Sequence, residues 1–546
     1  MRFLSLLFLA SLLHAQTYAP RVNTGARLEP KDSLMHGAGQ DLWFPVSEQT
    51  PSSFSLYSSV MPADRKPMVY MFYLNLNSLT ANWADTRKLE LQSSGFVTFQ
   101  LGLSMTDGVA NHYEAQVAAG VYDTQIGYLI KGLRELATPV YLRIGYEFDG
   151  AGWNGYVPGP YVQAFQRIAA AIHAALDLEV ATVWDAEIPD GTSNYADFYP
   201  GDSYVDWFGA NVFKTAGFSS PELASFIALA IQHNKPVLMG ELTPIYVGAQ
   251  GGADSWNSWY IQFFNFLANT PQVKQFNYID WYWPYWSQLM SGSWPDWGDS
   301  RLEIDSASYV RNLYVQQLAD PVFLHSGSES SFRQLLGYND TTPPPAPSAF
   351  LAFSRLGCVT LSWEPVADPS GIARYYLYRN GSLFDYSLGS PYTDLSVESG
   401  TQTYVIAAMD RAGNLSSLSA AQTITVEATR PRRSGTLDEC NEKHLLRKVS
   451  GRESPGGSGG FGWSGAGRGF PPYQLAALQI NSKVGFLVDA RFVGLNRHRS
   501  PRFPEGGWPP TALGGKHFVP FLARIRTRSR LNRAHDVGTL QFRRTG

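Results

Sequence analysis

Short apolar segments alternate with longer amphipathic segments over the first half of the chain. The short segments are apolar without interruption, which is typical of strands buried on both faces of a sheet. Eight of them are found, at residues 34–37, 68–74, 96–101, 139–145, 180–184, 205–212, 236–240 and 276–281. Between them, segments such as 162–176 and 221–233 repeat apolar residues at spacings of three and four, which predicts helices.

Regular alternation of strands and helices predicts parallel strand pairing, because parallel strands need a crossover connection. Eight such units within about 250 residues match the size of a closed (β/α)8 barrel. We therefore expect a barrel of this α/β class over residues 28–330. An open, doubly wound sheet is the alternative, and the absence of a Gly-rich phosphate loop after the first strand argues against it.

A different pattern follows the barrel. Residues 340–348 are rich in proline, which predicts a stiff, extended linker. Beyond it, segments 358–363, 375–381 and 403–408 alternate apolar and polar residues between turn signals, which predicts a small all-β sandwich over residues 349–428. The order of a Trp strand, a Tyr-Arg-Asn-Gly turn and a Tyr strand resembles a fibronectin type III module, which we expect to act as a spacer.

The two ends of the chain differ from the rest. Residues 1–15 combine a charged start, an apolar run and a small residue, which predicts a secretory signal peptide and a protein secreted to the periplasm or the exterior. A membrane anchor is the weaker alternative, because the run is shorter than the roughly 20 residues that span a bilayer. Residues 429–546 are basic and Gly/Ser-rich without periodicity, which predicts a disordered tail. A polybasic patch for anionic polymers and translation past a frameshift are its alternatives.

Composition narrows the functional classes. Aromatic residues make up 14% of the chain, with 15 Trp, which leaves rings available for ligands beyond those a core needs. The two cysteines, Cys358 and Cys440, exclude a disulfide framework, although one bridge between them stays open. Paired His/Cys metal spacing is absent, and no nucleophile elbow of the Gly-x-Ser-x-Gly kind follows a predicted strand, so we expect no metal or other cofactor. We also expect a monomer that binds no nucleic acid.

Two glutamates stand where barrel enzymes place their chemistry. Glu147 follows the fourth predicted strand and Glu241 the seventh, 94 residues apart, or three strand–helix units. Because the carboxyl ends of the strands share one face, both side chains are expected to open there. Two carboxyl groups at one mouth are the minimum machinery for cleaving a glycosidic bond, one as proton donor and one as nucleophile or base. A structural ion pair is the alternative for either glutamate alone.

Three segments resemble a known enzyme family. Residues 143–150 (Arg-Ile-Gly-Tyr-Glu-Phe-Asp-Gly), 205–209 (Val-Asp-Trp-Phe-Gly) and 240–243 (Gly-Glu-Leu-Thr) are similar to strands four, six and seven of family 26 in clan A of the glycoside hydrolases. Known members of that family are mainly endo-β-mannanases. The resemblance covers about residues 30–320 and implies that Glu147 is the acid/base of a retaining mechanism, Glu241 the nucleophile and Arg143 a charge partner.

Two positions depart from the family pattern. Tyr146 stands where the family has a His before the acid/base, and Phe213 stands where a Tyr contacts the nucleophile. Neither change removes a carboxylate. The resemblance therefore supports glycoside hydrolysis but does not imply that the substrate is mannan. A barrel that binds glycan without cutting it stays an alternative.

Aromatic and polar residues near the predicted strand ends supply the sugar-binding half of the hypothesis, because sugar C–H faces pack on flat rings. Trp281 and Trp283 alternate on the predicted eighth strand, so only one of them is expected to face the site. The candidate substrate-binding residues are Arg143, Tyr146, Trp153, Trp184, Asn211, Trp281 and Trp283.

These observations together predict a secreted retaining glycoside hydrolase, endo-acting on a β-linked polysaccharide or oligosaccharide. A catalytically silent carbohydrate-binding barrel is one alternative. A cell-surface adhesion or scaffold protein is another, although scaffolding has no need of carboxylates at two strand ends.

Overall fold

The computed structural model describes residues 16–41, 52–85, 96–188, 194–285, 294–355, 357–395 and 397–427. The predicted signal peptide at residues 1–15 and the predicted tail at 429–546 lie outside these ranges, so both stay predictions. Among the helices of the described ranges, none combines the length and apolarity that crossing a bilayer would require.

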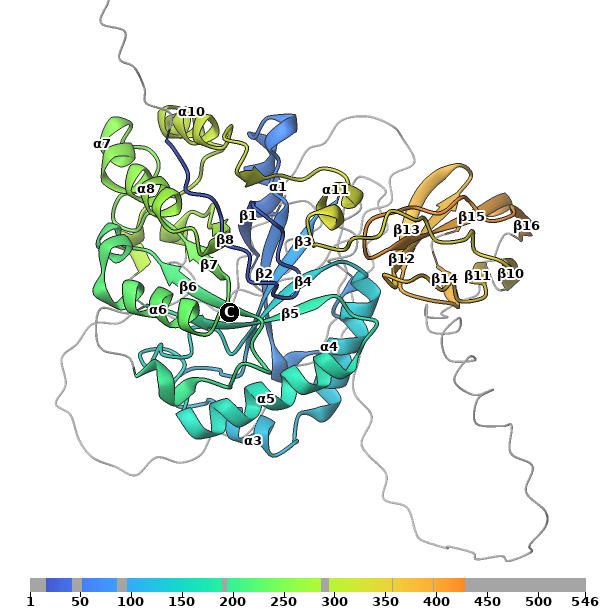
Figure 1. The fold of residues 1–546 in the computed structure, drawn as a ribbon, viewed down its shortest axis with the longest axis horizontal. Helices are drawn as coiled ribbons and strands as arrows, with labels where there is room; N and C mark the ends of the chain where they lie inside the picture. Colours follow the sequence, from blue (N-terminus) through green and yellow to red (C-terminus); the bar gives the residue numbers. More distant parts are fainter. Residues whose placement is uncertain are drawn as a thin grey trace, which may run out of the picture. The chain divides into compact units, whose positions relative to one another are not determined.

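Eight parallel strands form a closed barrel (Figure 1). They are β1 (Leu34–Asp41), β2 (Val69–Asn75), β3 (Thr98–Ser104), β4 (Val140–Ile144), β5 (Val180–Ala186), β6 (Trp207–Val212), β7 (Val237–Leu242) and β8 (Val273–Tyr278). Strands β2 to β8 pair in sequence order, and β1 pairs with both β8 and β2, which closes the ring. Short β9 (Phe323–Leu324) adds to β1. The barrel prediction is confirmed, and closure excludes the open sheet.

Helices surround the strands. They are α1 (Ser53–Ser59), α3 (Glu114–Ala118), α4 (Asp123–Leu136), α5 (Pro158–Ala174), α6 (Pro221–Gln232), α7 (Ala253–Ser255), α8 (Ile261–Asn269), α10 (Ser308–Gln317) and α11 (Glu329–Gln334). The two predicted helices correspond to α5 and α6. Local chemistry fixes the start of α6, because the Ser220 side chain accepts a hydrogen bond from Leu223 N and Pro221 occupies the first turn.

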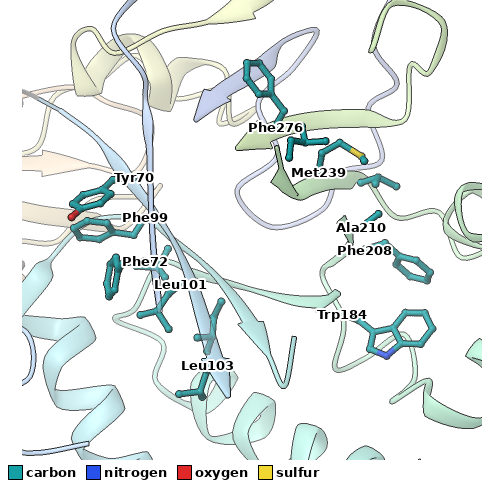
Figure 2. Close-up of a cluster of buried hydrophobic side chains, with 14 of the residues drawn as sticks. Tyr70, Phe72, Phe99, Leu101, Leu103, Trp184, Phe208, Ala210, Met239 and Phe276 are labelled. Carbon is teal, nitrogen blue, oxygen red and sulfur yellow. The ribbon is translucent and has the colours of Figure 1, made fainter. Parts of the chain in front are cut away.

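The core lies between the strands and the helices. Side chains of alternate strand residues point outward into this layer and are almost fully buried. Figure 2 shows ten of them from six strands, namely Tyr70, Phe72, Phe99, Leu101, Leu103, Trp184, Phe208, Ala210, Met239 and Phe276. Because side chains alternate along a strand, the residues next to these point into the barrel.

Inside the barrel, the lining changes from apolar to polar along its axis. A buried cluster that includes Met35, Val183 and Leu238 lies toward the amino ends of the strands. Above it, Gln275 Nε2 donates to Gln100 Oε1 over 2.7 Å, and Gln100 Nε2 donates to the Gly240 carbonyl over 2.8 Å. This buried amide pair supports β7 one residue before Glu241.

The segment after the barrel is all β, as predicted. One sheet has the order β10 (Leu351–Arg355), β11 (Cys358–Ser362), β14 (Tyr392–Asp394), and the other has the order β13 (Ser382–Ser387), β12 (Ile372–Arg379), β15 (Gly400–Asp410), β16 (Gln422–Val426). All of these pairings are antiparallel. Trp363, Leu377 and Tyr404 belong to one buried cluster between them. Cys358 is disulfide-bonded, and its partner lies outside the described residues.

Candidate active site

Arg143 and Glu241 form an ion pair across the barrel mouth. Arg143 lies on β4, and its Nη2 donates to Glu241 Oε1 over 2.8 Å. Glu241 belongs to β7 rather than following it, because that strand runs to Leu242. Arg143 is fully buried and Glu241 almost so. A buried guanidinium needs anionic partners, and Glu241 supplies one.

Asp185 supplies the second anionic partner. It lies on β5, fully buried, with Oδ1 3.1 Å from Arg143 Nη1. Burial raises the pKa of Asp185 to about 7, while Arg143 acts in the opposite direction and Glu241 raises it further. Asp185 was not predicted from the sequence, although an acid inside an otherwise apolar strand was an available signal.

Glu147 sits on a sharp turn directly after β4. Gly145 and Glu147 both have positive φ, at 56° and 52°. For a non-glycine residue this conformation is uncommon and strained, and such residues concentrate at functional sites. Several contacts hold the turn. The Glu147 N–H lies 3.4 Å from Asp185 Oδ1, the Phe148 N–H donates to the Asp185 carbonyl over 3.2 Å, and Asn154 Nδ2 donates to the Glu147 carbonyl.

Asn211 joins the acid/base candidate to Arg143. It lies on β6 beside a register shift after Ala210, and its Nδ2 donates to Glu147 Oε1 over 2.9 Å. Its Oδ1 accepts from Arg143 Nη1 over 3.4 Å. The two predicted catalytic carboxyl groups therefore belong to one chain of contacts, Glu147–Asn211–Arg143–Glu241.

The environment of Glu147 favours its protonated form. Burial raises the pKa of Glu147 well above its usual value, and the charges of Glu241 and Glu187 add to this effect, whereas the Asn211 hydrogen bond opposes it. A carboxylic acid that stays protonated near neutral pH is what a general acid requires. Glu241 instead faces a guanidinium, the setting of an ionised carboxylate.

Aromatic rings line the same mouth. The Tyr146 ring lies 4.9 Å from Arg143 Cζ and 5.4 Å from the ring of Trp153, which is partly exposed. Trp281 is also partly exposed, and Phe213 packs on Trp297 at 5.4 Å between ring centroids. These positions suit sugar contacts at the rim of the barrel.

The two eighth-strand tryptophans do not alternate on a strand. Strand β8 ends at Tyr278, and Trp283 begins a short 3-10 turn that runs to Tyr285. Trp283 is 3% exposed, and its Nε1 donates to Thr243 Oγ1 over 2.9 Å. Trp283 belongs to a buried cluster at the mouth and Trp281 packs against it. The expectation that these residues alternate on a strand is therefore wrong, and the expectation that only one ring faces the site stays a prediction.

Trp184 does not reach the site. It is fully buried and points outward from β5, where it stacks on Phe148 at 4.4 Å and contacts Phe208 and Phe226 (Figure 2). The alternation of side chains turns Asp185 inward and Trp184 outward. The structure therefore removes Trp184 from the candidate substrate-binding residues and assigns it to the core.

Two further residues at the mouth carried no sequence signal. The Tyr73 ring, on β2, lies 5.6 Å from Arg143 Cζ. Burial raises the pKa of Tyr73, and the charge of Glu241 raises it further. Glu187 follows β5 and is partly exposed. It acts on Glu147 through its charge.

Carboxylates that are close enough to share a metal ion were found in one group among the described residues. It consists of Asp340, Asp368 and Asp410, whose oxygens lie within 4.8 Å of one another, and it contains none of the barrel-mouth residues. Acidic groups of this kind are common without an ion, so this group alone does not indicate a metal site.

Comparison with known proteins gives the class of the chain. No family model matches it. It is 27% identical over 343 residues to the β-1,3-xylanase TXYA of a Vibrio species. The aligned region covers 58% of this chain and 70% of that protein. A β-1,3-xylanase of an Alcaligenes species is 26% identical over 331 residues, covering 56% and 67%. Both relatives are glycoside hydrolases, and the enzyme class predicted from the sequence is confirmed at that level.

Solved structures give a weaker likeness. A modular endo-β-1,4-mannanase from Cellulomonas fimi shares 15% identity, with 75% of this chain and 99% of that chain covered at a TM-score of 0.39. At that score the likeness adds nothing to the barrel, which follows from this chain's own strand pairing.

Proposed function

We propose that this chain is a secreted retaining glycoside hydrolase that cleaves a β-linked glycan, with Glu147 as acid/base and Glu241 as nucleophile. The observation that carries the proposal is the continuous set of contacts Glu147–Asn211–Arg143–Glu241 at the barrel mouth. It places one carboxyl group in a setting that keeps its proton and another against a guanidinium. That asymmetry is what cleavage of a glycosidic bond by two carboxyl groups needs.

The proposed reaction has two steps. Glu241 attacks the anomeric carbon while Glu147 donates its proton to the leaving glycosidic oxygen, which breaks the C–O bond and leaves a glycosyl ester on Glu241. Glu147, now ionised, then takes a proton from water, and the hydroxide formed attacks the same carbon and releases Glu241. Asn211 donates to Glu147 in its charged form between the steps, and Arg143 stabilises the Glu241 carboxylate when it leaves.

The substrate is proposed from two observations. Partly exposed Trp153 and Trp281 provide rings for sugar faces at the rim. The relatives that match more than half of the chain are β-1,3-xylanases, so we propose β-1,3-xylan as the first substrate to test, ahead of the β-mannan that the family resemblance alone would suggest. Tyr146 and Phe213, at the two positions that depart from the mannanase pattern, are consistent with a different sugar.

The other segments complete the proposal. Residues 1–15 direct secretion, residues 28–330 form the catalytic barrel, residues 340–348 link it to a fibronectin type III-like spacer over 349–428, and the basic residues 429–546 follow that spacer. The enzyme acts as a monomer and without a cofactor.

The deciding experiment measures reducing-sugar release from β-1,3-xylan, β-1,4-xylan, β-mannan and β-glucan by the wild type, Glu147→Gln and Glu241→Gln. Glu179→Gln is the matched control, since Glu179 is also buried but pairs with Arg333, outside the contacts at the mouth. We expect activity to collapse in both catalytic variants and to persist in the control. Proton NMR of the first product tests retention of the anomeric configuration.

The second candidate, a silent carbohydrate-binding barrel, is favoured by Tyr146 and Phe213. It predicts no release from any glycan, together with binding that survives Glu147→Gln. Turnover that survives both catalytic substitutions would overturn the proposed roles of the two glutamates.

A further inference from the structure

One oxygen of Asp185 contacts both Glu147 and Arg143, the residue that binds Glu241. Its Oδ1 lies 3.1 Å from Arg143 Nη1, and Arg143 binds Glu241 through the other terminal nitrogen. The same Oδ1 lies 3.4 Å from the backbone N–H of Glu147, on the strained turn after β4. The orientation of Arg143 and the placement of Glu147 therefore depend on the same carboxylate.

Two neighbouring strands leave room for this carboxylate by carrying glycine. A Cβ on Gly209 of β6 would overlap Asp185 Oδ2, and a Cβ on Gly240 of β7 would lie 2.7 Å from it. A Cβ on Gly240 would also lie 2.6 Å from Asn211 Oδ1 and 2.8 Å from Arg143 Nη1. Any larger residue at either position would displace the group that orients Arg143.

Stability alone does not explain an acid at this position. Asp185 is fully buried, and its Oδ2 has no hydrogen-bond partner among the described residues. A buried charge with an unsatisfied oxygen is unfavourable, as the rise of the Asp185 pKa to about 7 also indicates. Such groups are retained where an active site needs them.

Without the Asp185 charge, Arg143 would be held less firmly. Its Nη1 would keep only the 3.4 Å contact with the neutral Asn211 amide. A guanidinium is planar, so a rotation about that weaker contact also moves Nη2 relative to Glu241. Loss of the Asp185 charge would thus disturb the contact between Arg143 and the nucleophile Glu241, which Asp185 itself does not touch.

We propose that Asp185 is a positioning residue of the active site, which orients Arg143 against Glu241, holds the turn at Glu147, and acts in its ionised form. This inference rests on the proposed function, since it assigns Asp185 to the same reaction. It adds a residue that acts through its neighbours and touches neither the substrate nor the reacting atoms.

The test compares Asp185→Asn with Asp206→Asn in the full chain. The first substitution keeps the shape and one acceptor while removing the charge. Asp206 is a matched control because it also contacts β5, through Thr182, but pairs with His173 on α5 outside the mouth. We expect Asp185→Asn to lower kcat about 100-fold with KM nearly unchanged, as for loss of a preorganised charge, and Asp206→Asn to keep the wild-type kcat.

The pH profile separates positioning from a merely structural role. If the ionised form is required, wild-type kcat falls as the pH drops through the range near 7, and Asp185→Asn loses this acid-side fall. A purely structural defect would lower kcat by the same factor at every pH. The proposal is overturned by near wild-type kcat in Asp185→Asn, by a uniform loss, or by a wild-type acid limb that lies wholly below pH 5. The acid limb of the wild-type profile is measured without a variant, so it tests the proposal even if Asp185→Asn does not fold.

Failure of the proposed function would be recognised separately. If the wild type cleaves no glycan, that function fails, and a crystal structure of Asp185→Asn then tests the positioning role. A displaced Arg143 with its Glu241 contact broken supports the role, whereas an unchanged contact and an unchanged turn at Glu147 overturn it.

Discussion

Nδ2 of Asn211 donates a 2.9 Å hydrogen bond to Oε1 of Glu147, while Oδ1 of the same amide accepts from Arg143 over 3.4 Å. The amide thus donates to an acid and accepts from a cation, which no carboxylate can do. The bond to Glu147 opposes burial and three neighbouring negative charges, all of which raise the pKa of that glutamate. The Asn211 hydrogen bond consequently limits the rise in the pKa of Glu147.

Replacing Asn211 with Ala should move the basic limb of the pH–kcat profile to higher pH. Glu147 donates a proton in the first step, so activity is lost as the pH rises through its pKa, and removal of the Asn211 N–H raises that pKa further. We also expect kcat to fall at least about tenfold, because ionised Glu147 loses its donor. Asn269→Ala, which removes an exposed amide bonded to Asn265, is the control. A basic limb that stays in place or moves down would contradict the role of Asn211.

Replacing Glu187 with Gln should move the basic limb of the pH–kcat profile to lower pH. The Glu187 charge raises the pKa of Glu147, so its removal lowers that pKa, and the protonated acid is lost at a lower pH. We expect kcat at the optimum to change by no more than about threefold, since the substitution neutralises one charge and keeps the size of the side chain. The measurement is the pH–kcat profile beside Glu135→Gln, which neutralises a glutamate paired with Lys131 on α4. An unmoved limb would show that Glu187 is screened from Glu147.

The strand order was predictable because continuous apolar runs and helical periodicity persist through eight units. The inward or outward direction of each side chain was not, because both faces of a barrel strand are buried and the usual alternation of polar and apolar residues disappears. Trp184 and Asp185 illustrate this difficulty. The ring was expected at the site and lies in the core, whereas the acid beside it was overlooked and contacts Arg143.

The two glutamates were easier to place than the residues around them. Their spacing of three units is a property of the sequence. Tyr73 approaches Glu241 from β2, and that approach exists only after the barrel closes through β1. No local pattern around residue 73 indicates it.

Removal of the Tyr73 hydroxyl should lower kcat while leaving the fold intact. The hydroxyl lies beside Glu241, whose charge raises the pKa of Tyr73. In the family pattern a Tyr at position 213 contacts the nucleophile, and this chain has Phe213 there. For Tyr73→Phe we expect kcat to fall about tenfold or more, because a preorganised donor at the nucleophile is lost, with KM and Tm close to wild type since the ring remains. Tyr314→Phe is the control, because it removes a buried hydroxyl that bonds Tyr57 on α1. Equal kinetics for Tyr73→Phe and the wild type would remove Tyr73 from the candidate site.

The two tryptophans after β8 should differ in their contributions, with Trp283 needed for stability and Trp281 for substrate binding. Trp283 is 3% exposed and ties its turn to Thr243, so Trp283→Ala should open a cavity, lose a hydrogen bond and destabilise the fold by about 3–5 kcal/mol. Trp281 is partly exposed at the mouth, so Trp281→Ala should chiefly weaken substrate binding and raise KM about tenfold, with a smaller change in Tm. Thermal unfolding and steady-state kinetics of both variants provide the measurement. A large fall in Tm with unchanged KM for Trp281→Ala would make its role structural, and a wild-type Tm for Trp283→Ala would show that its burial contributes little. Either result would change which ring is assigned to the sugar. A rise in KM shows lost substrate binding only when the variant is still folded under the assay conditions, so the change in Tm has to be known first.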